Sequence, residues 1–212
     1  PMNKCLVFDK RLDVADLKPR SLLCVGGTRS GKSDFALHYA QNVQGPKTFI
    51  ATMQKSFAAP QENSEQGNSA GQQKESTDKE IQKRILNHQK QRNSTWVTIE
   101  EPYDLISAAN LAKRNNSKII VIDCISLWLS NLLLANETEE AILKKTNDVA
   151  KMISDTQIPL VLVSNEVGMG IVPIYEEARI FRDIQGKANQ IFAEACEAVI
   201  TFSCGIPILI KG

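Results

Sequence analysis

The amino-acid sequence predicts an α/β fold with a mainly parallel sheet flanked by helices, on three observations. Short apolar runs of strand length alternate along the chain with longer stretches whose apolar residues recur at helical spacing. The run at 118–123 is apolar until it closes on a carboxylate, which is typical of a central parallel strand. The run at 22–25 leads directly into a glycine-rich loop and a helix. With 212 residues and no internal repeat, we expect one domain, at 3–212.

The same patterns place the other elements in order. Residues 3–20 mix polar and apolar side chains and are compatible with a hairpin. Strands are expected at 22–25, 47–52, 96–100, 118–123, 159–164, 198–203 and 207–211. Helices are expected at 34–40, 78–92, 104–115, 125–134, 138–156 and 176–197. The last two strands are joined only by Cys204, Gly205 and Ile206, which predicts an antiparallel pair at the C-terminal end.

The segment 55–76 interrupts this alternation. Gln, Ser, Asn, Glu, Lys and Gly dominate it, so it cannot bury enough apolar surface to offset the entropy lost on ordering. We therefore expect a mobile insertion. Order resumes at Thr77, which with Glu80 forms a capping-box pattern for the helix at 78–92.

Composition and charge argue against several classes of function. The chain has 25 Lys and Arg residues and 24 Asp and Glu residues, and this net charge of +1 gives no support for binding nucleic acid or a membrane surface. The most apolar stretch, 119–135, contains Asp123 and Asn131 and is interpreted as a strand and a buried helix rather than a membrane span. The cysteines lack a metal-type spacing and resemble small apolar residues of a reducing cytoplasm: Cys5, Cys24, Cys124, Cys196 and Cys204.

The glycine-rich loop has the phosphate-binding pattern of two glycines followed by Lys and Ser. Its residues, all expected to bind nucleotide, are Gly26, Gly27, Thr28, Arg29, Ser30, Gly31, Lys32 and Ser33. Glycines let backbone N–H groups turn inward, and the helix start adds a positive dipole. Lys32 can neutralise phosphate oxygens, and the Ser33 hydroxyl can ligate Mg²⁺. The alternative, a glycine-rich turn that binds nothing, leaves the flanking strand and helix unexplained.

Asp123 closes the strand at 118–123. In open α/β sheets, ligands gather at the carboxyl ends of strands. This carboxylate is therefore a candidate ligand of Mg²⁺ or its water, beside the phosphate loop. The alternative is that Asp123 caps the helix at 125–134.

One of the two histidines has neighbours that suggest chemistry. Arg84, His88 and Arg92 are four residues apart on a predicted helix and therefore lie along one stripe. The two guanidinium groups attract phosphate and favour a neutral imidazole, which is a nucleophile towards phosphorus. From this pattern alone, an ordinary surface histidine is the alternative. His38, in the helix after the phosphate loop, has no such neighbours and is interpreted as structural.

The stretch 165–173 follows a buried strand directly. Its glycines suggest a loop shaped for close approach, at the sheet edge that holds the phosphate loop. Arg179, Arg182 and Asp183 follow on a helix. Their spacing is equally compatible with a role in the site and with a solvated, salt-bridged face.

Several motifs together resemble the adenosylcobinamide kinase/adenosylcobinamide-phosphate guanylyltransferase family of cobalamin synthesis. Beside the phosphate loop, they are Ile-Ala-Thr at 50–52, Arg-Ile-x-x-His-Gln-x-x-Arg at 84–92, Trp-x-Thr-Ile-Glu-Glu-Pro at 96–102, and the stretches 123–132, 164–173 and 178–190. A phosphate loop alone is generic, but this combination spans residues 22–211.

The resemblance implies a RecA-like fold, typically a homotrimer, with two activities. One phosphorylates the aminopropanol hydroxyl of adenosylcobinamide with ATP or GTP, and the other transfers GMP from GTP to that phosphate, giving adenosyl-GDP-cobinamide. The resemblance implies that His88 carries GMP covalently and that Lys32 shares the catalysis. By motif, the GTP contacts outside the phosphate loop are Thr52, Met53, Gln54, Gln89, Lys90, Gln91, Arg92, Glu100 and Asp123.

Two rival hypotheses come from other classes of protein. A phosphate-loop kinase of another small molecule would never form the histidine adduct. A RecA-like nucleotide-dependent assembly or regulatory protein would hydrolyse nucleotide slowly and would transfer nothing to cobinamide.

Overall fold

The computed structural model describes residues 4–7, 10–13, 18–53 and 95–212 of the chain. The predicted insertion at 55–76 and the predicted helix at 78–92, which carries His88, lie outside the described residues.

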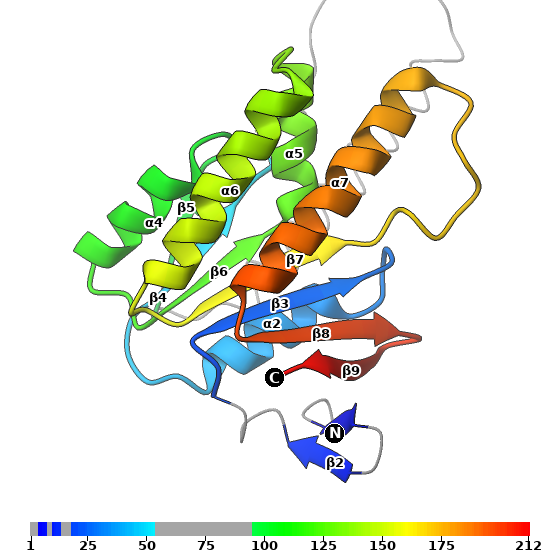
Figure 1. Cartoon of the computed structure of the whole chain (residues 1–212). Coiled ribbons are helices and arrows are strands. Elements are labelled where there is room, and N and C mark those ends of the chain that lie inside the picture. The colour runs from blue at the N-terminus through cyan, green and yellow to red at the C-terminus, as the bar shows by residue number, and fades with distance from the viewer. Residues whose placement is uncertain (1–3, 8–9, 14–17, 54–94) are drawn as a thin grey trace, which may run out of the picture.

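The described strands form one nine-stranded sheet (Figure 1). Across the sheet their order is β2-β1-β9-β8-β3-β7-β6-β4-β5. In chain order they are β1 (Lys4–Val7), β2 (Lys10–Asp13), β3 (Ser21–Gly26), β4 (Lys47–Ala51), β5 (Trp96–Glu100), β6 (Ile119–Asp123), β7 (Leu160–Asn165), β8 (Ala198–Ser203) and β9 (Ile206–Lys211).

Strand directions confirm the predicted architecture. From β8 through β3, β7, β6 and β4 to β5, every neighbouring pair is parallel. β8 and β9 pair antiparallel, which confirms the predicted C-terminal pair. β1 and β2 also pair antiparallel, which confirms the expected hairpin, and β1 lies parallel to β9.

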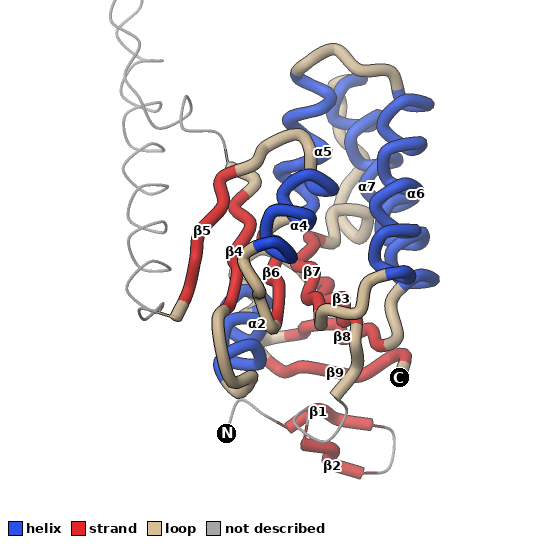
Figure 2. Tube along the Cα trace, turned by 90° about the vertical axis from the view of Figure 1, so that its left-hand side faces the viewer, coloured by secondary structure: helices blue, strands red, loops and turns tan. Residues whose placement is uncertain are grey.

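Five described helices cover the two faces of the sheet unequally (Figure 2). They are α2 (Lys32–Gln41), α4 (Leu105–Arg114), α5 (Ile125–Leu134), α6 (Glu139–Asp155) and α7 (Glu176–Ala195). Among the described helices, α2 is the one that covers the first face, where it packs against β3, β6 and β7. The other four pack against one another and form a second core with the opposite face. The helix at 125–134 has the predicted bounds, and the other described helices differ from theirs by at most two residues at either end.

Side-chain alternation assigns each strand residue to one of these two cores, because successive residues of a strand point to opposite faces. In β7, Leu160 and Leu162 join the core with α4 to α7, whereas Val161 and Val163 join the core with α2. The same alternation holds in β6, where Val121 lies on the α2 side. Both strands are apolar up to the polar residues at their carboxyl ends, because each of their faces is covered.

Among the described helices, none combines the length and the apolar character that a bilayer span requires.

Candidate functional site

The carboxyl ends of the parallel strands bring the described candidate residues to one edge of the sheet. Gly26 at the end of β3 pairs with Asn165 at the end of β7. Asp123 at the end of β6 pairs with Ala51 of β4, and Ala51 also pairs with Glu100 of β5. The loop that follows β7 therefore leaves from the same edge as the phosphate loop, as the sequence predicts.

The phosphate loop connects the end of β3 to the start of α2, and two of its glycines are required by the backbone. A Cβ at Gly26 would lie 2.9 Å from the carbonyl oxygen of Phe202, so a side chain there would collide with β8. Gly31 has a φ of 93°, a left-handed conformation that glycine adopts at no steric cost. Gly27, Thr28 and Arg29 are exposed at the tip of the loop. The loop can thus present its backbone to an anion.

Lys32 is the first residue of α2 and is only 6% exposed. Its Nζ donates to the carbonyl oxygen of Gly27 at 2.7 Å and to Oγ of Ser30 at 3.4 Å. Burial lowers the pKa of Lys32, and the negative charge of Asp123 opposes that shift. Both partners of the ammonium group thus belong to the loop itself. They are oxygens for which phosphate oxygens can substitute.

Asp123 lies on the α2 face of the sheet, by the alternation that places Ile119 and Val121 there. Its electrostatic effect on Lys32 shows that the two charges are close. The N-cap position of α5 is Cys124, so the alternative that Asp123 caps this helix is wrong. The arrangement suits a carboxylate that acts beside bound phosphates.

The thiol of Cys124, next to Asp123, is not a candidate nucleophile. Burial raises the pKa of Cys124 to about 12, with the charge of Asp123 adding to the shift. The group is therefore a neutral thiol at physiological pH, and a thiol is a far weaker nucleophile than a thiolate.

Thr52 joins the end of β4 to the end of β6. Its side chain is fully buried, and its hydroxyl donates to the carbonyl oxygen of Cys124 at 2.8 Å while accepting from the backbone N–H of Cys124 at 2.9 Å. The backbone N–H of Thr52 donates to the carbonyl oxygen of Asp123 at 3.3 Å. These bonds fix the backbone that follows directly after the Asp123 side chain.

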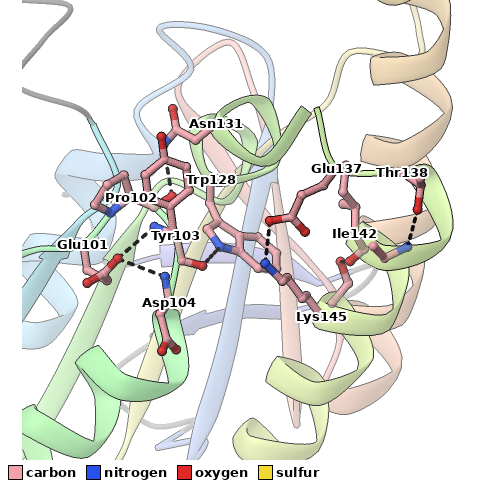
Figure 3. Close-up of polar contacts among 12 residues, drawn as sticks. Glu101, Pro102, Tyr103, Asp104, Trp128, Asn131, Glu137, Thr138, Ile142 and Lys145 are labelled. Atoms are coloured by element: carbon pink, nitrogen blue, oxygen red, sulfur yellow. Dashed lines mark hydrogen bonds and ion pairs between the residues drawn. The ribbon is translucent and has the colours of Figure 1, made fainter. Parts of the chain in front are cut away.

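The side chains of α5 fix the neighbouring loops. Asn131 is buried, and its Nδ2 donates to the carbonyl oxygens of Thr52 at 2.7 Å and Pro102 at 3.1 Å. Trp128 Nε1 donates to the carbonyl oxygen of Tyr103 at 2.9 Å. Figure 3 shows Trp128 and Asn131 beside the loop that follows β5, where Glu101 accepts from two backbone N–H groups of the same loop.

A second buried network holds the end of β7. Ser164 Oγ donates to Asn189 Oδ1 at 2.6 Å, and Gln185 Nε2 donates to Ser164 Oγ at 2.9 Å and to Asn189 Oδ1 at 3.0 Å. The backbone of Asn165 is held on both sides: its N–H donates to Ser126 Oγ at 2.9 Å, and its carbonyl accepts from Asn189 Nδ2 at 3.1 Å.

Arg179 has a role that neither sequence-based alternative described. It donates to the carbonyl oxygen of Pro173 at 3.2 Å and to that of Ile174. The guanidinium therefore holds the end of the β7–α7 connection. Among its described contacts there is no salt bridge and no residue of the phosphate loop.

The residue types suit Mg²⁺ only together with a bound nucleotide. Ser33, the second residue of α2, and Asp123 offer two oxygen ligands. Within the described part of the chain, no group of three or more His, Cys, Asp or Glu side chains could hold a metal ion. Mg²⁺ commonly takes one or two protein oxygens and completes its shell with phosphates and water, so this pair fits the ion.

Of the remaining predicted nucleotide-binding and catalytic residues, two belong to the described part of the chain and the others lie outside it. Met53 is half-buried beyond β4, and Glu100 is exposed at the end of the edge strand β5. His88, Gln54, Gln89, Lys90, Gln91 and Arg92 lie outside the described residues. Sequence reasoning assigned no role to Ser126, Asn131, Gln185 or Asn189, although a polar residue on the apolar stripe of a helix is the signal that could have found them.

Comparisons with known proteins agree on one family. The model of the family described as cobinamide kinase / cobinamide phosphate guanyltransferase matches residues 22–210. The chain is 33% identical over 196 residues to the bifunctional adenosylcobalamin biosynthesis protein CobP of Pseudomonas aeruginosa, covering 90% of this chain and 96% of that protein. It is 33% identical over 207 residues to the bifunctional adenosylcobalamin biosynthesis protein CobU of Salmonella typhimurium, covering 90% and 99%.

Among solved structures, a KaiC-like protein from the hyperthermophilic archaeon Pyrococcus horikoshii is similar at 16% identity, with a TM-score of 0.44 over 85% of this chain and 69% of that one.

The family model covers the described site from the phosphate loop to the antiparallel strand pair. The chain therefore belongs to the cobinamide kinase / cobinamide phosphate guanyltransferase family.

Proposed function

We propose that this chain phosphorylates adenosylcobinamide with ATP or GTP and then transfers GMP from GTP to the resulting phosphate. The observation that carries the proposal is the family match over 22–210, which includes both the phosphate loop and the motif around His88. The two relatives named above are bifunctional proteins of adenosylcobalamin biosynthesis. The product is adenosyl-GDP-cobinamide, and pyrophosphate is released.

In the kinase step, the phosphate loop holds the triphosphate and Lys32 exchanges its bonds to Gly27 and Ser30 for phosphate oxygens. The aminopropanol hydroxyl oxygen attacks the γ-phosphorus. An O–P bond forms, the bond to the β,γ-bridging oxygen breaks with its electron pair, and the hydroxyl proton passes to solvent. Mg²⁺ held by Ser33 and Asp123 would offset charge on the phosphoryl oxygens.

In the transferase step, a neutral imidazole nitrogen of His88 attacks the α-phosphorus of GTP. An N–P bond forms, and the bond to the α,β-bridging oxygen breaks to release pyrophosphate. A phosphate oxygen of adenosylcobinamide phosphate then attacks the same phosphorus, and the N–P electron pair returns to the imidazole. The contacts carried over at Thr52, Met53, Gln54, Gln89, Lys90, Gln91, Arg92 and Glu100 belong to this proposal.

Mass spectrometry after incubation with GTP and Mg²⁺ tests the covalent step. We expect an acid-labile increment of the size of GMP on the peptide that contains His88, and its loss in His88→Ala. His38→Ala is the matched control, because His38 is the other histidine of the chain and lies on α2 beyond the phosphate loop. That variant should keep the increment.

The outcomes separate the three candidate functions. Kinase activity without an adduct on His88 would replace the proposal by a phosphate-loop kinase. Slow nucleotide hydrolysis without transfer to adenosylcobinamide would replace it by a nucleotide-dependent regulatory protein.

Assembly and location complete the proposal. We expect a homotrimer in the cytoplasm, where GTP and ATP are available as substrates. Light scattering of the purified protein measures its mass against the 23.5 kDa of one chain. A monomer or dimer at working concentration would contradict the trimer without affecting the proposed chemistry.

A further inference from the structure

We propose that Asn165 recognises the terminal phosphate group of the bound nucleoside triphosphate through its side-chain amide. The inference rests on the proposed function and deepens it, because it names the residue by which the site distinguishes a triphosphate from a diphosphate. No covalent step is assigned to this residue.

The strand order places Asn165 between the two charged groups of the site. β7 lies between β3, which leads into the phosphate loop, and β6, which ends at Asp123. Asn165 is the last residue of β7 and pairs with Gly26, while Asp123 pairs with Val163 two residues earlier. A group at this position is therefore next to both the start of the loop and the carboxylate.

The alternation of β7 decides which face of the sheet the Asn165 side chain occupies. Val161 and Val163 belong to the core under α2. Ser164, between Val163 and Asn165, turns the other way, and its hydroxyl reaches Asn189 on α7. Asn165 therefore points to the α2 face, where α2 packs over β6 and β7 and begins with Lys32.

The backbone of Asn165 is fixed, but its amide is not engaged. Ser126 and Asn189 hold the backbone N–H and carbonyl of Asn165 from two different helices. The side chain is half-buried, and its amide makes no hydrogen bond to any other residue that the structure describes. Because this amide has no hydrogen-bond partner among the described residues, its N–H groups can donate to a ligand that enters the site.

The chemistry of the position favours a phosphate oxygen as that ligand. The loop backbone and Lys32 supply the donors for an anion, while Asp123 and Ser33 offer oxygen ligands to a cation. A neutral amide between them can donate N–H groups to a phosphoryl oxygen without repelling the cation. The terminal phosphate extends furthest from the nucleoside, and GDP lacks it.

Binding of GDP and of the β,γ-imido analogue of GTP, both with Mg²⁺, tests the proposal by calorimetry. The measurements use the full chain carrying His88→Ala, so that no adduct forms during titration. In Asn165→Ala we expect affinity for the triphosphate analogue to fall by about 10- to 100-fold, the range for one hydrogen bond to a charged group. Affinity for GDP should stay within about twofold, because the lost contact involves only the third phosphate.

Two further variants make the result interpretable. Asn165→Asp keeps the size of the side chain and replaces the N–H donors by a negative charge. Its affinity for the triphosphate analogue should therefore fall further than that of Asn165→Ala. Asn110→Ala, on the exposed face of α4, is the matched control and should leave both affinities unchanged. The bonds to Ser126 and Asn189 use only the backbone of Asn165, so we expect all three variants to fold.

An equal loss for both nucleotides, or no loss for either, would overturn the role of Asn165. Those outcomes differ from failure of the proposed function, which would show as a missing GMP adduct on the protein with His88 intact. If the chain with native Asn165 bound neither nucleotide, both proposals would be wrong.

Discussion

The two ends of the parallel strands use polar side chains for different purposes. At the amino end, Arg20 donates from its backbone N–H and its Nε to Glu197, both at 2.7 Å, and Ser21 Oγ accepts from the backbone N–H of Glu197 at 2.9 Å. Thr48 and Ser117 join by a hydrogen bond between their hydroxyl groups. These groups hold strands and loops to one another, and each has a partner within the chain.

At the carboxyl end, neighbouring side chains hold the backbone of the functional residues. Among the described residues, the side chains of Lys32 and Asn165 do not themselves join one strand or loop to another. Thr52 fixes the backbone beside Asp123, and Ser126 and Asn189 fix the backbone of Asn165. Lys32 is buried and bonds only to oxygens of its own loop among the described residues. Buried hydrogen bonds thus organise the edge, and the groups that we assign to phosphate stay available. This arrangement costs free energy, because the Lys32 ammonium group is buried before the phosphate anion of the nucleotide binds.

Removal of the Lys32 ammonium should produce the largest effect. We expect Lys32→Met to weaken binding of GTP with Mg²⁺ by about 100-fold or more, because a charge-assisted bond to phosphate is lost. Arg20→Gln, just before the amino end of β3 and therefore at the opposite end of that strand from the phosphate loop, is the control and should bind as the native protein does. Equal binding by Lys32→Met and the native protein, in the same calorimetric titration, would show that this lysine does not face the phosphates.

Thr52 tests whether the carboxyl edge is held by buried hydrogen bonds. Thr52→Val keeps the shape of the side chain but leaves the N–H and carbonyl of Cys124 without their hydroxyl partner. We expect the free energy of unfolding in urea to fall by about 2 kcal/mol. Thr52→Ser retains the hydroxyl and should recover much of that loss. A valine variant as stable as the native protein would mean that this bond does not organise the site.

The burial of Lys32 predicts an unusual dependence of stability on pH. Its pKa is lower in the folded protein than the ordinary 10.5, so the unfolded chain binds more protons between the two values. This lysine therefore destabilises the nucleotide-free protein at neutral pH, and the penalty disappears as pH rises through the folded pKa to above 10.5.

Thermal unfolding of Lys32→Met and of the native protein, at neutral and at alkaline pH, tests whether Lys32 destabilises the nucleotide-free fold. The variant should be more stable at neutral pH without nucleotide, and the difference should shrink in alkaline buffer. A variant that is less stable at neutral pH would show that the bonds to Gly27 and Ser30 outweigh the cost of burying the charge.

The smallest effect is expected at the amino end. Hydrogen bonds from Arg20 lower the pKa of Glu197, so this carboxylate stabilises the fold above its unfolded value of 4.5, and that gain is lost as pH falls through the folded pKa. Because the pair is exposed and screened by solvent, Glu197→Gln should cost less than about 1 kcal/mol. Nucleotide affinity should not change. A large change in affinity would remove the distinction between the two ends.

The fold was predictable from local patterns, because the interiors of the central strands β3, β6 and β7 are apolar runs covered on both faces. The bounds expected for β5, β8 and α5 agree with the structure, and the phosphate loop has the predicted strand and helix on its flanks. These features depend on residues close together in the sequence. The same holds for the position of Asp123 at the end of β6.

The partners in the supporting network were not predictable, because they depend on how helices cross the sheet. Gln185 and Asn189 lie on the apolar stripe of α7, which signals burial but does not say which groups they meet. They are buried because α7 passes over the end of β7 and meets Ser164, which lies 21 and 25 residues away along the chain. The orientation of Asn165 likewise follows only once α2 is known to cover the opposite face.

Hydrogen–deuterium exchange with and without GTP and Mg²⁺ tests the central claim most directly. If the carboxyl end is the nucleotide site, protection should increase at Gly26 to Ser33, at Asp123 and at Asn165, and the segments at Arg20 and Glu197 should exchange as before. Protection confined to the amino end, or none at the phosphate loop at a saturating concentration of GTP, would contradict the account.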